Sequence, residues 1–157
     1  MPPSGVIREQ AVFAKSPLQG KDLDPVTADA PTLPRMNILI VDDDKDSAMT
    51  LGWLVEMLGQ DYKLAHTGQE ALDVAPAYKP NLVLMDISLP GMTGYEACQK
   101  MRENPALANT VIAAQTGWGE EQHRQKTKEA GFDHHLVKPI SVASLKELLE
   151  SIQKAKA

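Results

Sequence analysis

Residues 81–94 read NLVLMDISLPGMTG, and this stretch decides which fold the sequence predicts. The apolar run 82–85 ends in a single carboxylate, Asp86, and a Pro- and Gly-bearing loop follows at once. An apolar run bounded by turn signals is typical of a strand that is buried on both faces. In open α/β sheets ligands bind at the carboxyl ends of the strands, so Asp86 is a candidate functional residue. Taken alone, it is better explained as a cap of the following turn.

Four further segments have the pattern of strands, and three of them also end in polar groups. The predicted strands are 38–41, 62–66, 111–114 and 134–137. Asp42 and Asp43 follow the first of these strands, Thr116 follows the third, and Lys138 follows the last. The strand at 62–66 alternates between apolar and polar residues, which indicates a sheet edge. The strand at 134–137 is weakly apolar and is expected at the other edge.

Helical patterns separate these strands. Apolar residues recur at three- and four-residue steps between Ala48 and Leu58, and Gly59 ends that helix. Capping boxes at 67–70 and 93–96 open two more helices, and Ser141 caps the last. A helix opened by Glu120 and Glu121 ends at Ala130-Gly131. Strands that alternate with helices predict a parallel sheet covered on both faces, with strand order 2-1-3-4-5.

Composition separates a tail from a single domain. The chain has 157 residues, and its residues 1–36 hold six of the eleven prolines and no lasting periodic pattern. We predict a flexible Pro-rich linker over 1–36 and one folded domain over 37–157. The alternative for the linker is that Val12-Phe13-Ala14 docks onto a partner or onto the domain itself.

Charge and cysteine usage exclude several functional classes. The net charge of −5 argues against binding to nucleic acid or to an anionic membrane surface. No apolar run is long enough to span a bilayer, and the start lacks a signal-peptide core. The single cysteine, Cys98, fits a reducing cytoplasm and is expected to pack as a small hydrophobe. We therefore expect a cytoplasmic protein without nucleic-acid or membrane partners.

The predicted strand order brings the polar strand ends into one crevice. Carboxylates that crowd together raise one another's pKa, and they stay ionised together if a divalent cation is present. Oxygen ligands with room for water suit Mg²⁺. An ammonium from Lys138 and a hydroxyl from Thr116 would complete a clamp for a phosphoryl group. Asp86 would then be the nucleophile that forms an aspartyl phosphate.

Four motifs in register resemble the signature of a response-regulator receiver domain. They are IVDDD at 40–44, MDISLPGMTG at 85–94, Thr116-Gly117, and HLVKP at 135–139. The resemblance covers residue 37 to about residue 155 and implies a flavodoxin-like (βα)5 fold. The run QTGWG…AGFDHHLVKP is more narrowly similar to the receivers of hybrid sensor histidine kinases, and the Pro-rich lead is similar to their linkers.

The resemblance also implies roles for individual residues in metal binding. Asp43 and Asp86 would bind Mg²⁺ directly, together with the backbone carbonyl of Ser88. Asp42 would act indirectly, through water or a hydrogen bond. The cofactor would be Mg²⁺.

For phosphoryl transfer, the resemblance implies that Asp86 is the phosphoacceptor. Thr116 would hydrogen-bond the phosphoryl group, Lys138 would pair with it, and the Lys138-Pro139 peptide bond is expected to be cis. Many receivers carry a rotamer-switching aromatic residue where this chain has His135. That histidine is a switch candidate whose charge would depend on pH, and a half-exposed edge-strand residue is the equal alternative.

The resemblance implies a signalling module rather than an enzyme, although a longer parent chain could be a hybrid histidine kinase. Its partners would be a sensor histidine kinase or a histidine phosphotransfer protein. A second copy could bind through the fourth helix, fifth strand and fifth helix.

Two alternatives to this function stay open. A haloacid-dehalogenase-type phosphatase also uses a strand-end aspartate, but it needs a second acid where this chain has Ser88. A receiver that no longer turns over phosphate would serve only as a docking surface.

Overall fold

The computed structural model describes residues 34–117 and 124–156. All of the described residues belong to one compact unit. Most of the predicted linker, including Val12-Phe13-Ala14, lies outside the described residues. Met36 is only 2% exposed, and its N–H donates a hydrogen bond of 2.6 Å to Gln60 Oε1. The packed domain therefore begins before Asn37.

The described strands form one parallel sheet of five. They are β2 (Asn37–Val41), β3 (Asp61–Ala65), β4 (Leu82–Asp86), β5 (Val111–Thr116) and β6 (His134–Val137). Their spatial order is β3-β2-β4-β5-β6. Counted along the chain this is 2-1-3-4-5, so the predicted flavodoxin-like order is confirmed.

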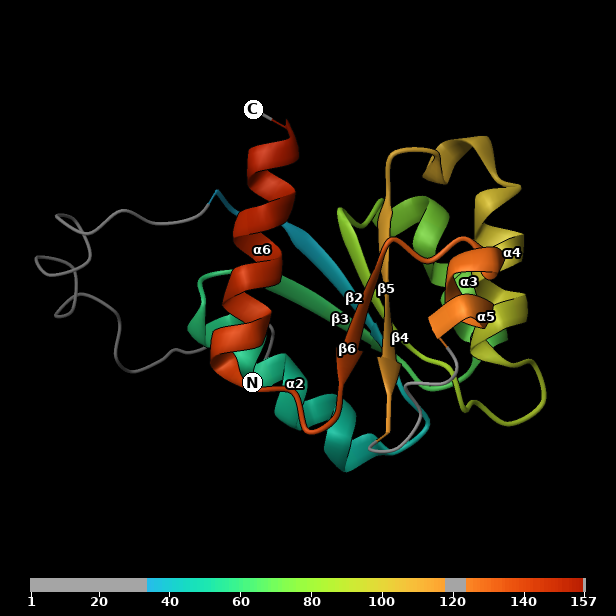
Figure 1. Ribbon diagram of the computed structural model, residues 1–157, viewed down its shortest axis with the longest axis horizontal. Helices are drawn as coiled ribbons and strands as arrows, with labels where there is room; N and C mark the ends of the chain where they lie inside the picture. Colours follow the sequence, from blue (N-terminus) through green and yellow to red (C-terminus); the bar gives the residue numbers. More distant parts are fainter. Residues whose placement is uncertain (1–33, 118–123, 157) are drawn as a thin grey trace, which may run out of the picture. The chain divides into compact units, whose positions relative to one another are not determined.

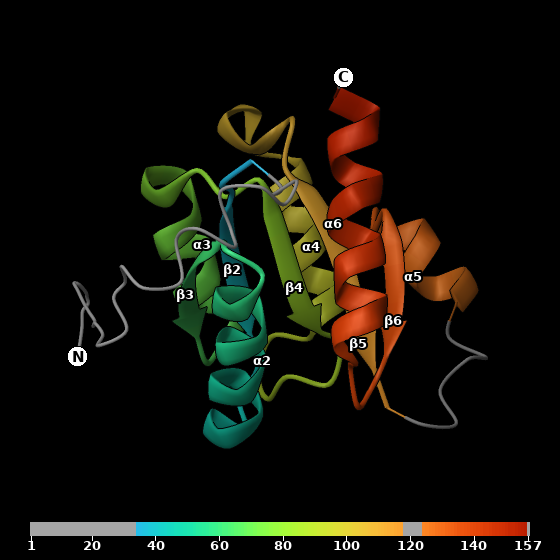
Figure 2. The ribbon, with the colours of Figure 1, turned by 90° about the vertical axis from the view of Figure 1, so that its left-hand side faces the viewer.

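Helices cover both faces of the sheet (Figures 1 and 2). On one face lie α2 (Lys45–Met57) and α6 (Val142–Lys156). On the other face lie α3 (Gly68–Tyr78), α4 (Gly94–Arg102) and α5 (Arg124–Ala130). A short 3-10 helix, η1 (Pro105–Leu107), follows α4. The predicted opening of α5 at Glu120 and Glu121 falls outside the described residues.

The two helical layers produce two apolar cores, one on each side of the sheet. Successive side chains of a strand point to opposite faces. In β2, Leu39 and Val41 therefore pack towards α3 and α4, whereas Ile38 and Ile40 pack towards α2 and α6. All five residues of β4 are buried, because this strand has a neighbour on each side and helices on both faces.

The edge strands are also as predicted. In β3, exposed residues alternate with better-buried ones, and every residue of β6 is half-buried. Each of these strands has a neighbour on one side only, which explains why their sequences are less apolar than that of β4.

Side-chain caps begin the three helices for which the sequence predicts them, which are α3, α4 and α6. The capping box of Thr93 and Glu96 at α4 is complete, and Ser141 Oγ accepts a hydrogen bond from Ser144 N–H at 3.1 Å. At α3, Thr67 accepts from Glu70 N–H, as predicted. The Glu70 carboxylate, however, accepts from His66 N–H rather than from Thr67, so the predicted capping box is shifted by one residue.

Cys98 on α4 is fully buried, which confirms the packing role predicted for it. Burial raises the pKa of its thiol from 9.0 to about 11. Because the thiolate is the reactive form, we expect alkylation of the folded protein at pH 8 to be at least about 100-fold slower than in denaturant. Mass spectrometry after timed exposure to iodoacetamide measures both rates. Similar rates in buffer and denaturant would contradict the buried placement.

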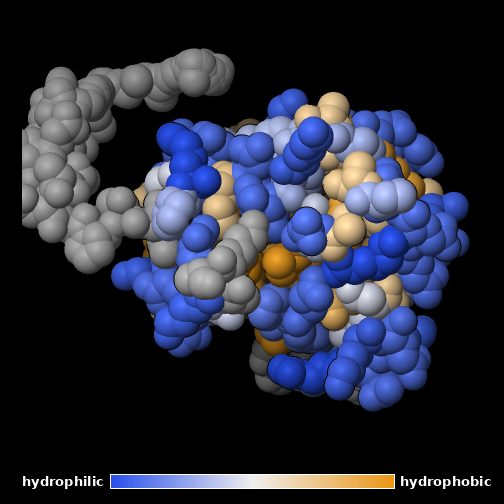
Figure 3. All heavy atoms as spheres, turned by 90° about the horizontal axis from the view of Figure 1, so that it is seen from above, coloured by the Kyte–Doolittle hydropathy of each residue, from blue (hydrophilic) through white to orange (hydrophobic). Residues whose placement is uncertain are grey.

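Figure 3 looks onto the edge of the sheet where the strands begin, and most of its coloured surface is hydrophilic. Among the described helices, none combines the length and apolar character needed to cross a bilayer.

Candidate functional site

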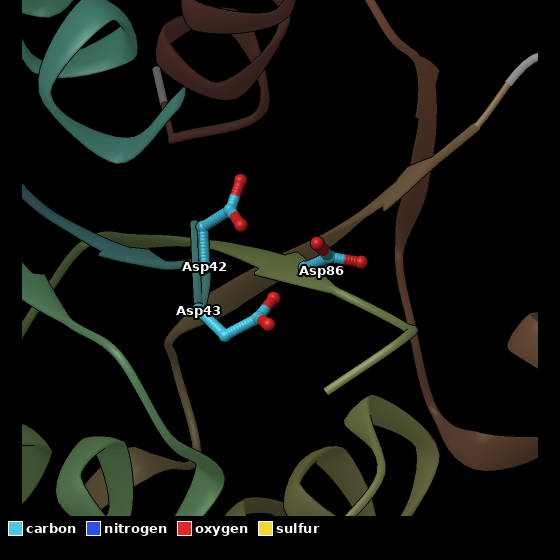
Figure 4. A group of neighbouring side chains, drawn as sticks. All are labelled: Asp42, Asp43 and Asp86. Carbon is cyan, nitrogen blue, oxygen red and sulfur yellow. The ribbon is translucent and has the colours of Figure 1, made fainter. Parts of the chain in front are cut away.

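The three predicted acids meet where β2 and β4 end. Val41 pairs with Met85 in the sheet, so Asp42, the next residue, lies beside Asp86, the last residue of β4. Carboxylate oxygens of Asp42, Asp43 and Asp86 lie within 4.8 Å of one another. Figure 4 shows the three side chains side by side, with Asp43 extending towards Asp86. The sheet order therefore gathers these acids from two separate motifs.

Lys138 reaches the acids from the turn between β6 and α6. Its Nζ donates to Asp86 Oδ2 at 2.8 Å and to Asp42 Oδ2 at 3.0 Å. The Lys138-Pro139 peptide bond is cis, as expected. Burial lowers the pKa of the ammonium, but the hydrogen bonds and the negative charges of Asp86 and Asp42 together outweigh burial and leave the pKa raised. Lys138 is therefore a fixed positive charge between two acids at neutral pH.

Asp42 is 1% exposed and forms the floor of the site. Its Oδ1 accepts from Asp44 N–H at 3.0 Å, and Asp44 in turn caps α2. Burial raises the pKa of this carboxyl more than Lys138 and the Asp44 N–H lower it, and Asp86 raises it further. The site gathers three carboxylates around one ammonium, and this excess of acids suits a further cation.

Asp86 is 7% exposed, and both of its oxygens are engaged. Oδ1 accepts from Ser88 N–H at 2.8 Å, and Oδ2 accepts from Lys138. The structure thus places Ser88 at the site, and the ligand role of its carbonyl oxygen stays a prediction. At the start of α4, a Cβ on Gly94 would lie 2.4 Å from the Asp86 carbonyl oxygen. Only glycine lets α4 approach this strand end so closely.

Thr116 is at the end of β5 and is fully buried. Its Oγ1 lies 2.9 Å from His135 Nε2 and donates to the Leu136 carbonyl at 3.3 Å. Both partners belong to β6, so the hydroxyl faces the edge strand in this structure and not the carboxylates. His135 points inward to this contact, which the sequence left as an alternative to surface exposure.

Sequence reasoning missed one side chain at the site. His66, just after β3, has its ring Nδ1 3.0 Å from the carbonyl oxygen of Asp42. No spacing rule within the sequence connects residues 42 and 66. The sheet register, in which Val41 pairs with Ala65, is what brings them together.

A pocket of about 260 Å³ adjoins the acids. Asp42 and Lys138 border it on the side of the site, and Leu51 and Leu54 of α2 line its apolar side. Of the three acids, Asp42 alone lines this pocket, so the pocket gives access to the Asp42 and Lys138 side of the site.

Comparison with known proteins identifies the family of this chain. The response regulator receiver domain family matches residues 38–150 of the chain. The chain belongs to the receiver domain family. It is thus a receiver domain of the kind found in two-component response regulators, with the flavodoxin-like fold of that family.

Relatives of this receiver include signalling proteins. It is 29% identical over 115 residues to the polar-differentiation response regulator DivK of Brucella anthropi, which covers 73% of this chain and 94% of DivK. A putative response regulator from Chloroflexus aurantiacus has a similar structure, with a TM-score of 0.73, 29% identity, and coverage of 77% of this chain and 99% of the other.

A second similar structure contains a metal ion. The receiver domain of the sensor histidine kinase PA1611 from Pseudomonas aeruginosa has a TM-score of 0.71 and 26% identity to this chain. The similarity covers 77% of this receiver and 99% of the PA1611 domain. That structure has a magnesium ion coordinated in the active-site cleft.

Proposed function

We propose that this receiver is a phosphoacceptor that takes a phosphoryl group on Asp86 from a phosphohistidine. The contact that carries the proposal is the pair of hydrogen bonds by which Lys138 Nζ joins Asp86 to Asp42. A carboxylate held beside one fixed cation and two further acids suits nucleophilic attack on phosphorus. An Asp86 oxygen would bond to phosphorus while the P–N bond of the phosphohistidine breaks, and the imidazole keeps the electron pair and takes up a proton.

The chain's own residues fit a Mg²⁺ site. Three carboxylates with ligand oxygens within 4.8 Å form an oxygen-only donor set, which Mg²⁺ prefers. In our proposal Asp43 and Asp86 bind the ion directly, with the Ser88 carbonyl, and Asp42 acts indirectly. Mg²⁺ neutralises charge that develops on the phosphoryl oxygens. Asp43 is exposed and so lies on the side of the group that an incoming donor meets first.

Lys138 and Thr116 have different roles in the proposal. Lys138 already touches Asp86 and can follow the phosphoryl oxygens with little movement. Thr116 must turn its hydroxyl from β6 towards the site to donate to the phosphoryl group. That turn would release His135, so phosphorylation at one strand end would change the edge strand β6.

The partners follow from this assignment. We propose that a sensor histidine kinase or a histidine phosphotransfer protein supplies the phosphoryl group in the cytoplasm. The output would be a protein contact or onward phosphotransfer, and a second copy is one candidate partner. A groove between β6 and α6, lined by His135, Leu136 and Leu148, supports an output surface on this side of the domain.

Intact-mass spectrometry tests the proposal. The chain is incubated with Mg²⁺ and a small phosphodonor such as acetyl phosphate. We expect the mass to increase by one phosphoryl group, and hydroxylamine should remove that group because an acyl phosphate is labile to it. Peptide mapping should place the group on Asp86.

The same measurement separates the alternatives. No mass gain with Mg²⁺ present would favour a docking module without phosphate turnover. Steady phosphate release from many phosphate esters would favour a phosphatase of the haloacid-dehalogenase type. A hydroxylamine-stable product on Ser88 would contradict the assignment of Asp86.

A further inference from the structure

The carbonyl group of Asp42 is part of the peptide bond that joins Asp42 to Asp43, two of the three acids at the site. On its amino side the peptide chain is fixed to the sheet, since Asp42 N–H donates to Ala65 O at 3.0 Å. This hydrogen bond is the last rung between β2 and β3. Beyond it, β2 ends and the residues that carry the acids begin.

A continued parallel ladder would supply the next donor from the N–H of Thr67, given that Val41 pairs with Ala65. Thr67 instead begins α3 as its N-cap. Across the described residues, no backbone N–H donates to the Asp42 carbonyl. The ring of His66 takes this place, with Nδ1 at 3.0 Å from the oxygen. Because a carbonyl oxygen only accepts, Nδ1 carries the hydrogen.

His66 is itself held in place. Its backbone N–H donates to Glu70 Oε1 at 2.6 Å, which ties it to the first turn of α3. Its side chain is half-buried, next to the fully buried Ala65. The backbone that carries the ring is therefore held in place. The ring N–H replaces the Thr67 N–H, which would donate to the Asp42 carbonyl if β3 continued instead of turning into α3.

We infer that His66 is a positioning residue for the divalent-cation site, in which its Nδ1–H fixes the Asp42-Asp43 peptide so that the Asp43 carboxylate faces Asp86. This inference rests on the proposed function, because it assigns the cation to the same acids. Asp43 is exposed, and its direction depends on the peptide that precedes it. Partners that orient metal ligands typically affect metal affinity strongly although they never touch the ion.

Mg²⁺ affinity of the full chain, measured by calorimetric titration, tests the inference. His66→Leu removes the donor and should raise the dissociation constant roughly tenfold. His66→Asn puts an amide N–H close to the position of Nδ1 and should restore the wild-type constant to within about twofold. As a matched control, His134→Leu makes the same chemical change on the other edge strand and should leave the constant unchanged.

A second readout separates positioning from damage to the fold. The unfolding temperature is measured in EDTA and at one fixed excess concentration of Mg²⁺, because a bound ion stabilises the folded state by an amount that grows with the logarithm of [Mg²⁺]/Kd. The increase caused by Mg²⁺ should shrink in His66→Leu and return in His66→Asn. Equal affinities of the wild type and His66→Leu would overturn the inference, and so would an Asn variant as weak as the Leu variant.

The failure of the inference can be told from the failure of the proposed function. Phosphoryl uptake by the wild type decides the proposed function, and the ratio of Mg²⁺ dissociation constants decides the role of His66. A wild type that binds Mg²⁺ but takes up no phosphoryl group would overturn only the proposed function. A wild type that binds no Mg²⁺ would overturn the role inferred for His66.

Discussion

Lys138→Met is expected to slow phosphoryl uptake from a small donor on the order of 100-fold while Mg²⁺ still binds. The ammonium is the fixed cation at the site, bonded to Asp86 Oδ2 and to Asp42 Oδ2. Methionine keeps the length and apolar stem of the side chain and removes the charge. The rate is measured as mass gain over time at saturating Mg²⁺.

Mg²⁺ affinity makes this prediction specific. Without Lys138 the acids lose the positive charge that offsets part of their repulsion, so the variant should bind Mg²⁺ at least as tightly as the wild type. Lys146→Met is the control, because Lys146 is an exposed lysine on α6. It should change neither quantity. Loss of Mg²⁺ binding together with phosphoryl uptake in Lys138→Met would mean that the lysine holds the fold of the site and does not serve the transfer itself.

Gly94→Ala is expected to reduce the free energy of unfolding by about 3 kcal/mol. The new Cβ would lie 2.4 Å from the Asp86 carbonyl oxygen and 2.6 Å from Ile87 Cα. Both contacts are with backbone, so no side chain can turn aside to relieve them. Urea unfolding followed by circular dichroism measures the change, and phosphoryl uptake should fall as well because Asp86 is displaced.

Gly68→Ala is a matched control for this change. Gly68 is also the first residue of a helix behind a threonine cap, and it is also buried. The three atoms nearest to its new Cβ all belong to the side chain of Met92, with the sulfur at 3.1 Å, and that side chain is flexible. The control should cost less than about 1 kcal/mol. Equal losses in the two variants would show that the backbone contact at Gly94 is not the cause.

The sequence predicted the sheet because the strands differ in burial. A strand covered on both faces, such as β4, needs an unbroken apolar run, whereas an edge strand such as β3 tolerates alternation. That difference distinguished the edges and so indicated the order of the strands. The order alone then predicted that Asp42 and Asp86 meet, and their oxygens do lie together.

Features that depend on the register between distant segments could not be predicted in the same way. The hydrogen bond from His66 to the Asp42 carbonyl exists because the pairing of β2 with β3 ends at Val41 and Ala65, so β3 offers no backbone N–H to that carbonyl. Similarly, the Glu70 carboxylate accepts a hydrogen bond from the N–H of His66, although the capping-box spacing predicts a bond from the N–H of Thr67. The direction of the Thr116 hydroxyl depends on an inward-pointing ring from β6, which no local pattern encodes.

The described part of the chain enters and leaves the domain at the end of the sheet where the strands begin, which is the end away from the acids. Arg35 pairs with Asp61 where β3 begins, and α6 runs back along the sheet to the same end (Figure 1). Asp86 lies where the strands finish. A segment joined to residue 34 or to residue 156 would therefore start at the end of the domain away from the acids. We expect that joining the domain to a longer polypeptide at these two points would leave the acids on the side facing away from the junctions.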